Sequence, residues 1–273
     1  MIWALEYAVT RAHSDTSILY GAEGGAREFP FCYFVVRDGD RVVMVDCGFD
    51  DNAYTRGLMA DLGISDFQPL DVVLARIGLA PSDVTDVVLT HHHFDHAGAV
   101  EMLPSATVWI QEREVEDWTV KWTASPRLEW LRAGLDPDTG PTLARLRAAG
   151  RLRLVDGAAQ VTPRVAVRPA FTSHTEGSQY VVLTGADGRP WVVAGDVAYV
   201  YENLGGLDGT QPLVPIGRVQ GSVERCLRVT EEMLELVGEN VSRVLPMHEA
   251  RLWDQFPATR HDDGLHVAEI EKC

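Results

Sequence analysis

The segment from Thr90 to Gly98 contains the residues best suited to chemistry in this chain. It reads Thr-His-His-His-Phe-Asp-His-Ala-Gly, so the pattern His-x-His-x-Asp-His places four potential metal ligands close together: His91, His93, Asp95 and His96. Imidazole nitrogens combined with a carboxylate suit zinc and, less selectively, iron or manganese. The alternative interpretation is a solvated histidine-rich turn that binds metal only adventitiously.

The residues before this motif predict where it lies. Residues 83–90, Asp-Val-Thr-Asp-Val-Val-Leu-Thr, end in an apolar, β-branched run that is typical of a buried strand. The motif would then occupy the loop that leaves this strand, at the carboxyl edge of a sheet, where α/β proteins commonly place their chemistry. We therefore interpret the motif as a metal site at the end of a strand.

Together with four other segments, the motif resembles the metallo-β-lactamase fold superfamily along most of the chain. Residues 41–48 look like an early strand of that family, ending in an Asp-x-Gly turn whose carboxylate, here Asp46, orients the metal ligands. The other matching residues are His174 in 171–178, Asp196 after Gly195, and His248 in 244–249. The His174 segment departs from the family pattern Gly-His-Thr-x-Gly-His, because Ser173 replaces the glycine and Ser178 the second histidine.

The resemblance implies a site for two divalent metal ions, with Zn²⁺ the first choice and iron or manganese the others. One ion would be held by His91, His93 and His174, the second by Asp95, His96 and His248, and Asp196 would bridge them. Two such ions generate hydroxide from a shared water near neutral pH and polarise a carbonyl or phosphoryl oxygen, as a hydrolase requires. We expect His92 to be a hydrogen-bonded neighbour of the site and not a ligand.

Tyr199 indicates a branch within the superfamily. It follows Asp196 by three residues and, with Phe-Pro-Phe-Cys-Tyr at 29–33, resembles the quorum-quenching N-acyl homoserine lactonases. The resemblance implies that the Tyr199 hydroxyl hydrogen-bonds the reacting ester while metal-bound hydroxide attacks and Asp95 moves a proton. We therefore expect an enzyme that opens a lactone ring. An ordinary half-buried residue at a strand edge is the alternative interpretation of Tyr199.

Other functions remain open at this point. A thioesterase or other carboxylic-ester hydrolase could use the same two metals, and a coenzyme A or glutathione thioester would favour basic anchors at the mouth of the site. Arg145, Arg147, Arg151 and Arg153 could supply them, although a solvated helix face also explains this stretch. A non-catalytic, metal-stabilised binding or sensing protein is a further alternative.

Composition narrows these possibilities. With 273 residues, 46% of them hydrophobic, the chain can bury the core of one domain over 1–273. The net charge of −16 repels polyanions, so nucleic acid is a poor partner and a small ester or lactone a better one. No run approaches the roughly 20 apolar residues of a membrane span. The start lacks the pattern of a secretory signal, and the four spread cysteines fit a reduced cytoplasm. A homodimer is left open.

The apolar patterns predict a mixture of strands and helices. Strands are expected at 31–36, 42–45, 84–90, 107–111, 165–168, 180–184, 191–194 and 243–246, and helices near 68–77, 112–122, 143–149 and 223–237. This pattern gives an α/β class, and the family resemblance implies a four-layer αββα sandwich. A variable helical insertion is expected around 112–150, where Trp118, Trp122 and Trp130 either pack a helical pair or form a lid over the site.

Overall fold

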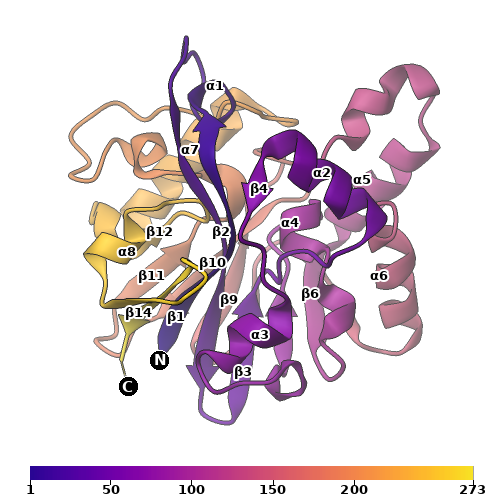
Figure 1. The fold of residues 1–273 in the computed structure, drawn as a ribbon, viewed down its shortest axis with the longest axis horizontal. Helices are drawn as coiled ribbons and strands as arrows, with labels where there is room; N and C mark the ends of the chain where they lie inside the picture. The colour runs from indigo at the N-terminus through magenta and orange to yellow at the C-terminus, as the bar shows by residue number, and fades with distance from the viewer. Residues whose placement is uncertain (273) are drawn as a thin grey trace.

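The computed structural model describes residues 1–272, which form two β-sheets packed against each other with helices on both outer sides (Figure 1). The larger, nine-stranded sheet has the order β13-β14-β1-β2-β3-β5-β6-β7, with β4 paired to β1. The smaller, five-stranded sheet has the order β12-β11-β10-β9-β8. The predicted αββα sandwich is confirmed. Cys273, one of the four cysteines considered above, lies outside the described residues.

The elements have the following bounds. The larger sheet contains β1 (Ile2–Ser14), β2 (Ala26–Asp38), β3 (Arg41–Val45), β4 (Ile64–Ser65), β5 (Asp86–Val88), β6 (Thr107–Gln111), β7 (Leu152–Val155), β13 (Ala258–Arg260) and β14 (His266–Glu271). The smaller sheet contains β8 (Ala159–Thr162), β9 (Val165–Pro169), β10 (Gln179–Thr184), β11 (Pro190–Val193) and β12 (Val244–Leu245). The α-helices are α1 (Asp15–Ile18), α2 (Ala53–Leu62), α3 (Leu70–Ala75), α4 (Phe94–Ala97), α5 (Glu112–Thr123), α6 (Thr139–Ala148), α7 (Val223–Leu236) and α8 (Leu252–Gln255).

The alternation of side chains along the strands explains the layers. In β1, Ile2 and Ala4 belong to the core between the two sheets, whereas Trp3 and Leu5 belong to the core between the larger sheet and its helices. Successive residues of a strand point to opposite faces, so a strand buried on both faces is apolar throughout. Figure 1 shows α3, α4 and α6 on the outer side of the larger sheet and α7 on that of the smaller one.

Each strand predicted from the sequence is present, but several elements were missed. The long strand β1 and the helix α2 were not predicted, although Asn52 caps α2 by accepting hydrogen bonds from the Tyr54 and Thr55 amides. The interpretation of the four arginines as a helix face was wrong in part, because Arg151 directly precedes β7 and Arg153 lies within it. Among residues 1–272, no helix is long and apolar enough to cross a membrane.

The region 112–150 forms α5, the short 3₁₀ segment Pro126–Arg132 and α6. Trp118 and Trp122 pack on each other with ring centroids 5.5 Å apart, and Trp118 also lies against Gly140 of α6. Trp130 is instead 75% exposed and contributes to the wall of the main cavity. The first two tryptophans therefore hold the helical pair together, while the third faces the site.

The strand ends gather the predicted site residues at one edge of the sandwich. Strands β3 and β5 are parallel neighbours, as are β11 and β12. Asp46 directly follows β3, and the motif beginning at His91 follows β5. Asp196 and His248 follow β11 and β12, while His174 lies in the loop between β9 and β10. Carboxyl ends of parallel strands meet at the same edge, so residues more than 150 positions apart can converge there.

Candidate metal centre

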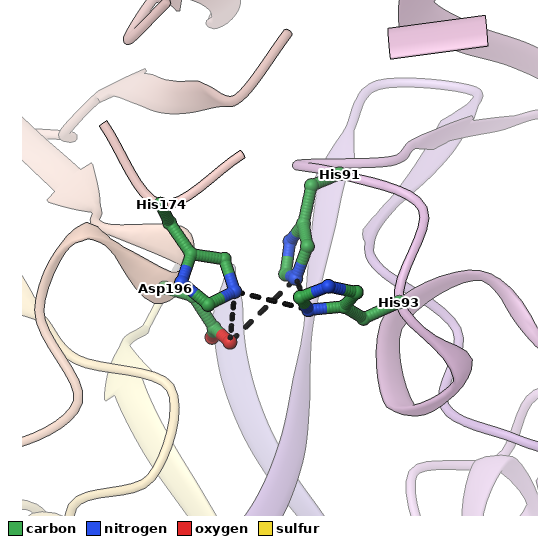
Figure 2. A group of neighbouring side chains, drawn as sticks. All are labelled: His91, His93, His174 and Asp196. Carbon is green, nitrogen blue, oxygen red and sulfur yellow. Dashed lines mark hydrogen bonds and ion pairs between the residues drawn. The ribbon is translucent and has the colours of Figure 1, made fainter. Parts of the chain in front are cut away.

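The predicted ligands form two clusters. The first consists of His91, His93, His174 and Asp196, with one ligand atom from each within 4.8 Å of the others. Asp196 Oδ2 lies 3.3 Å from His174 Nε2 and 3.6 Å from His91 Nε2, and His93 Nδ1 lies 3.0 Å from the Nε2 atoms of both histidines (Figure 2). These side chains converge from three separate loops onto one point, as a metal ion requires.

The second cluster consists of Asp95, His96 and His248. Asp196 faces it with its other oxygen, since Oδ1 lies 3.1 Å from His96 Nε2 and 3.3 Å from His248 Nε2. Asp95 Oδ2 lies 3.6 Å from His96 Nε2 and 3.9 Å from His248 Nε2. Because each oxygen of Asp196 faces a different cluster, this carboxylate is placed to bridge two ions.

Hydrogen bonds on the outer nitrogens orient three of the imidazoles. His96 Nδ1 donates to Asp46 Oδ2 at 2.8 Å, and His248 Nδ1 donates to the Pro30 carbonyl at 2.8 Å. The Thr90 hydroxyl donates to Asp46 at 2.8 Å and so accepts from His91 Nδ1 at 3.1 Å. With the proton on Nδ1, each Nε2 presents its lone pair to the centre, which is the tautomer that a metal needs. Asp46 therefore lies behind the ligands, in the position that the family resemblance implied.

The electrostatics of the site also fit a pair of cations. The buried atoms His96 Nε2 and Asp196 Oδ1 lie 3.1 Å apart, but within residues 1–272 neither has a partner in hydrogen-bond geometry. Burial lowers the pKa of His91 and His93, so both are neutral and able to bind metal. Burial also acts to lower the pKa of His96, but Asp196, Asp95 and Asp46 outweigh it and raise that pKa. The carboxylates around the second cluster thus favour a positive charge there.

A glycine brings the two sheets close enough for this geometry. Gly195 precedes Asp196, has a φ of 55° and lies against Thr90 at the end of β5. An added Cβ at Gly195 would be 3.0 Å from the Thr90 Cβ, which is tighter than ordinary packing and would require Thr90 to shift. The left-handed conformation and the close approach both favour glycine, and together they set Asp196 beside the ligands from β5.

A cavity of about 510 Å³ opens above the two clusters. Its floor includes His93, Asp95, His174, Asp196 and His248. Much of its wall is apolar, with Phe29, Phe31, Leu58, Leu62, Phe94 and Trp130. A cavity of this size and lining suits a small organic molecule that meets polar groups only at its reacting end.

Tyr199 also lines this cavity and is only 7% exposed. Its ring lies 5.9 Å from the ring of His174 and 5.5 Å from that of His248, so it contacts one ligand from each cluster. Burial raises the pKa of Tyr199 well above its usual value, and the charges of Asp196 and Asp95 raise it further. The phenol is therefore a hydrogen-bond donor at neutral pH.

Glu114 is a site residue that the sequence did not reveal. Its fully buried carboxylate accepts hydrogen bonds from the His92 amide at 3.0 Å and from the Gly177 amide at 2.7 Å. It also accepts one from the Thr175 hydroxyl at 2.8 Å and pairs with His92 Nδ1 at 2.8 Å. Glu114 thus ties the loop of His91 and His93 to the loop of His174. As expected, His92 is a hydrogen-bonded neighbour outside both clusters.

The same contacts account for one departure from the family motif. Ser178, which stands in place of a second histidine, accepts a hydrogen bond from the Thr175 amide at 2.9 Å and lies 2.6 Å from its hydroxyl. Burial alone would raise the pKa of Glu114, but His92 and the hydrogen bonds lower it to about 2. The group is therefore an ionised carboxylate that holds the His174 loop through Thr175 and Gly177.

We expect Glu114→Gln to weaken metal binding by roughly ten- to a hundredfold, as losses behind the ligands typically do. The amide nitrogen of glutamine cannot accept from the amide or hydroxyl donors that Glu114 now satisfies. Chelator competition on the purified protein measures the affinity. Glu116→Gln, an exposed change on the same helix, serves as the control. Equal metal affinity in both variants would show that Glu114 does not position the ligands.

Two packed sheets with outer helices, and histidine and carboxylate ligands at one edge, are typical of a metal-binding α/β sandwich protein. The model of the metallo-beta-lactamase superfamily matches residues 25–242, so the chain belongs to this superfamily. No curated protein matches the chain significantly.

Solved structures of similar fold include several lactonases. A probable metal-dependent hydrolase from Staphylococcus aureus is 16% identical, with a TM-score of 0.71 over 91% of this chain and 89% of that one. A variant of AiiA from B. thuringiensis with N-decanoyl-L-homoserine bound at its active site is 16% identical, with a TM-score of 0.68 over 93% and 95%. AidC, a dizinc quorum-quenching lactonase, is 15% identical, with a TM-score of 0.68 over 98% and 94%. At these identities the likeness concerns the fold.

Proposed function

We propose that this protein is a dinuclear metal-dependent hydrolase that opens a lactone ring. The observation that carries the proposal is Asp196, whose two oxygens face two separate histidine-containing clusters at the floor of one cavity. Two divalent ions bound there would supply an activated water and polarise the ester carbonyl. The fold shared with AiiA and AidC supports the choice of a lactone, with Zn²⁺ as the first candidate metal.

The chain's own residues would divide the remaining work. Tyr199 would donate a hydrogen bond to the oxygen that gains charge as the ester carbonyl is attacked. Asp95, at the edge of the second cluster, would accept and pass on a proton beside the leaving oxygen. The apolar wall formed by Leu58, Leu62 and Trp130 would hold the alkyl part of the substrate and keep bulk water away.

A thioesterase or other ester hydrolase is the second candidate, and a basic group at the cavity favours it. The predicted anchors do not serve, because none of Arg145, Arg147, Arg151 and Arg153 lines the cavity. Arg145 instead pairs with Glu101 at 2.7 Å, and Arg151 donates to the main-chain carbonyls of Ala106 and Leu103. Arg218, which was not singled out from the sequence, does line the cavity. Its charge suits a substrate with an anionic group.

The function is tested with a pH-stat screen of lactones, thioesters and β-lactams on the metal-loaded protein. We expect the fastest hydrolysis with a lactone. Faster turnover of thioesters would support the second candidate. If metal is bound but no ester, lactone or lactam is hydrolysed, a binding or sensing role replaces the enzymatic proposal.

We expect the purified protein to carry about two metal ions per chain, since the ligands form two clusters. Removing the metals with a chelator should lower the melting temperature, because the buried histidines and carboxylates then face one another without a cation. Elemental analysis and thermal unfolding measure the two effects. Protein that was never exposed to chelator and yet contains no metal would contradict the site assignment.

A further inference from the structure

Arg218 provides a positive charge at the cavity that the proposed metal chemistry does not use. Among residues 1–272, it is the only lysine or arginine that lines the cavity. Arg218 is exposed, and no carboxylate within residues 1–272 forms an ion pair with it. Arg27, by contrast, pairs with both Asp15 and Glu202. In a chain with a net charge of −16, this unpaired guanidinium is available to bind an anionic group that enters the cavity.

The backbone around Arg218 is fixed from both sides. On one side the Tyr20 amide donates to the Pro215 carbonyl at 2.8 Å, and Gly217 lies so close to α1 that an added Cβ would be 2.6 Å from the Thr16 oxygen. On the other side the Gln220 amide donates to the carbonyl of the ligand His174 at 3.1 Å. The segment that carries Arg218 is therefore held between α1 and the metal centre.

Two further polar side chains, His13 and Ser17, line the same cavity. The Ser17 hydroxyl donates to the Ser14 carbonyl at 2.8 Å, so the His13 Nε2–H donates to Ser17 Oγ at 2.8 Å. The His13 ring stacks on Phe29 at 4.5 Å, and Phe29 stacks on the ligand His248 at 4.1 Å. Burial, together with the nearby charge of Arg218, lowers the pKa of His13 to about 4, so among His13, Ser17 and Arg218 only the arginine is charged at neutral pH.

We propose that Arg218 binds a carboxylate of the substrate that is distinct from the reacting bond, so the substrate is a lactone or ester that also carries an acid group. A guanidinium binds a carboxylate through paired hydrogen bonds and stays charged at all relevant pH values. The negative surface disfavours anions in general, and Arg218 would select those whose acid group reaches its guanidinium while the reacting bond lies at the metals. This inference rests on the proposed ester or lactone hydrolysis and adds the chemistry of the rest of the substrate.

The test compares two esters of equal chain length on the metal-loaded protein. Mono-p-nitrophenyl glutarate ends in a carboxylate, and p-nitrophenyl pentanoate ends in a methyl group. We expect the wild type to prefer the glutarate ester by about tenfold in kcat/KM, as a charge-assisted contact at a partly open site allows. Arg218→Gln should bring the ratio close to one, and Arg218→Lys should keep part of the preference.

Arg147→Gln is the matched control, since it removes the same charge from an exposed position of α6 outside the cavity. It should keep the tenfold ratio. No preference in the wild type, or a preference that survives Arg218→Gln, would overturn the proposal.

A binding measurement separates this inference from the proposed function. By calorimetry, glutarate should bind metal-loaded wild type about tenfold more tightly than pentanoate, and Arg218→Gln should remove the difference. Both acids offer one carboxylate to the metals, so only the second carboxylate reports on Arg218. If no lactone, thioester or ester is hydrolysed but the calorimetric difference depends on Arg218, the hydrolase proposal fails and the anion site stands. If hydrolysis occurs and the two acids bind equally, the anion site fails.

Discussion

Asp196→Ala is expected to release both metals and to lower kcat/KM on any ester or lactone by about a thousandfold or more. Its Oδ2 faces His174 and its Oδ1 faces His96, so among residues 1–272 it is the one carboxylate that faces both clusters. Metal content by elemental analysis and initial rates on the same preparation measure the effect. His93→Ala, which removes a ligand from the first cluster alone, should also lose metal and activity.

Asp208→Ala is the control for Asp196, because it removes a carboxylate from an exposed loop beyond the site. It should keep wild-type metal content and rates. Full activity in Asp196→Ala or His93→Ala would place the ligands elsewhere.

Tyr199→Phe is expected to keep the metals and the fold but to lower kcat on a lactone by roughly ten- to a thousandfold, as the loss of an oxyanion donor does. The phenylalanine ring preserves the packing against His174 and His248 and removes only the hydroxyl. Steady-state kinetics at matched metal content measure the effect. A change confined to KM would indicate substrate binding without catalysis.

Tyr20→Phe, a change at an exposed position in the turn after α1, controls for the loss of a hydroxyl in general. Unchanged lactone kinetics in Tyr199→Phe at wild-type metal content would remove Tyr199 from the mechanism.

The site could be predicted from the sequence only where its ligands stand close together along the chain. His91, His93, Asp95 and His96 stand within six residues, so their order alone indicated a metal site. The more distant His174, Asp196 and His248 could be placed only through the family resemblance, since nothing local distinguishes a ligand histidine from a packed one. The structure brings all of these side chains together at one edge of the sandwich.

Residues that act through long-range contacts escaped prediction. Glu114 accepts its hydrogen bonds from residues 22, 61 and 63 positions away, and its position at the start of a helix resembles that of an ordinary first-turn acid. Arg218 lies in a loop whose course is set by contacts with α1 and the His174 loop. In both cases the tertiary fold, and not the local pattern, decides what the side chain meets.

Some elements were missed although their signals are present. Residues 2–9 form an unbroken apolar run except for Glu6, as expected of a strand buried on both faces. Asn52 followed by Thr55 is the capping pattern that begins α2. The Arg145–Arg153 stretch was read as one helix face, but α6 ends at Ala148 and β7 begins at Leu152.

The position of Glu114 sets a limit on how this protein can be re-engineered. Residues 112–150 are a natural segment to exchange with that of a related protein, because Trp130, Ala133 and Gly134 line the cavity. A chimera joined before residue 112 would discard the carboxylate that fastens the His92 and Gly177 amides and would be depleted of metal, whatever its new substrate contacts. A junction placed within α5, after Glu114, keeps these hydrogen bonds. The segment that can be exchanged without loss of metal is therefore shorter than residues 112–150.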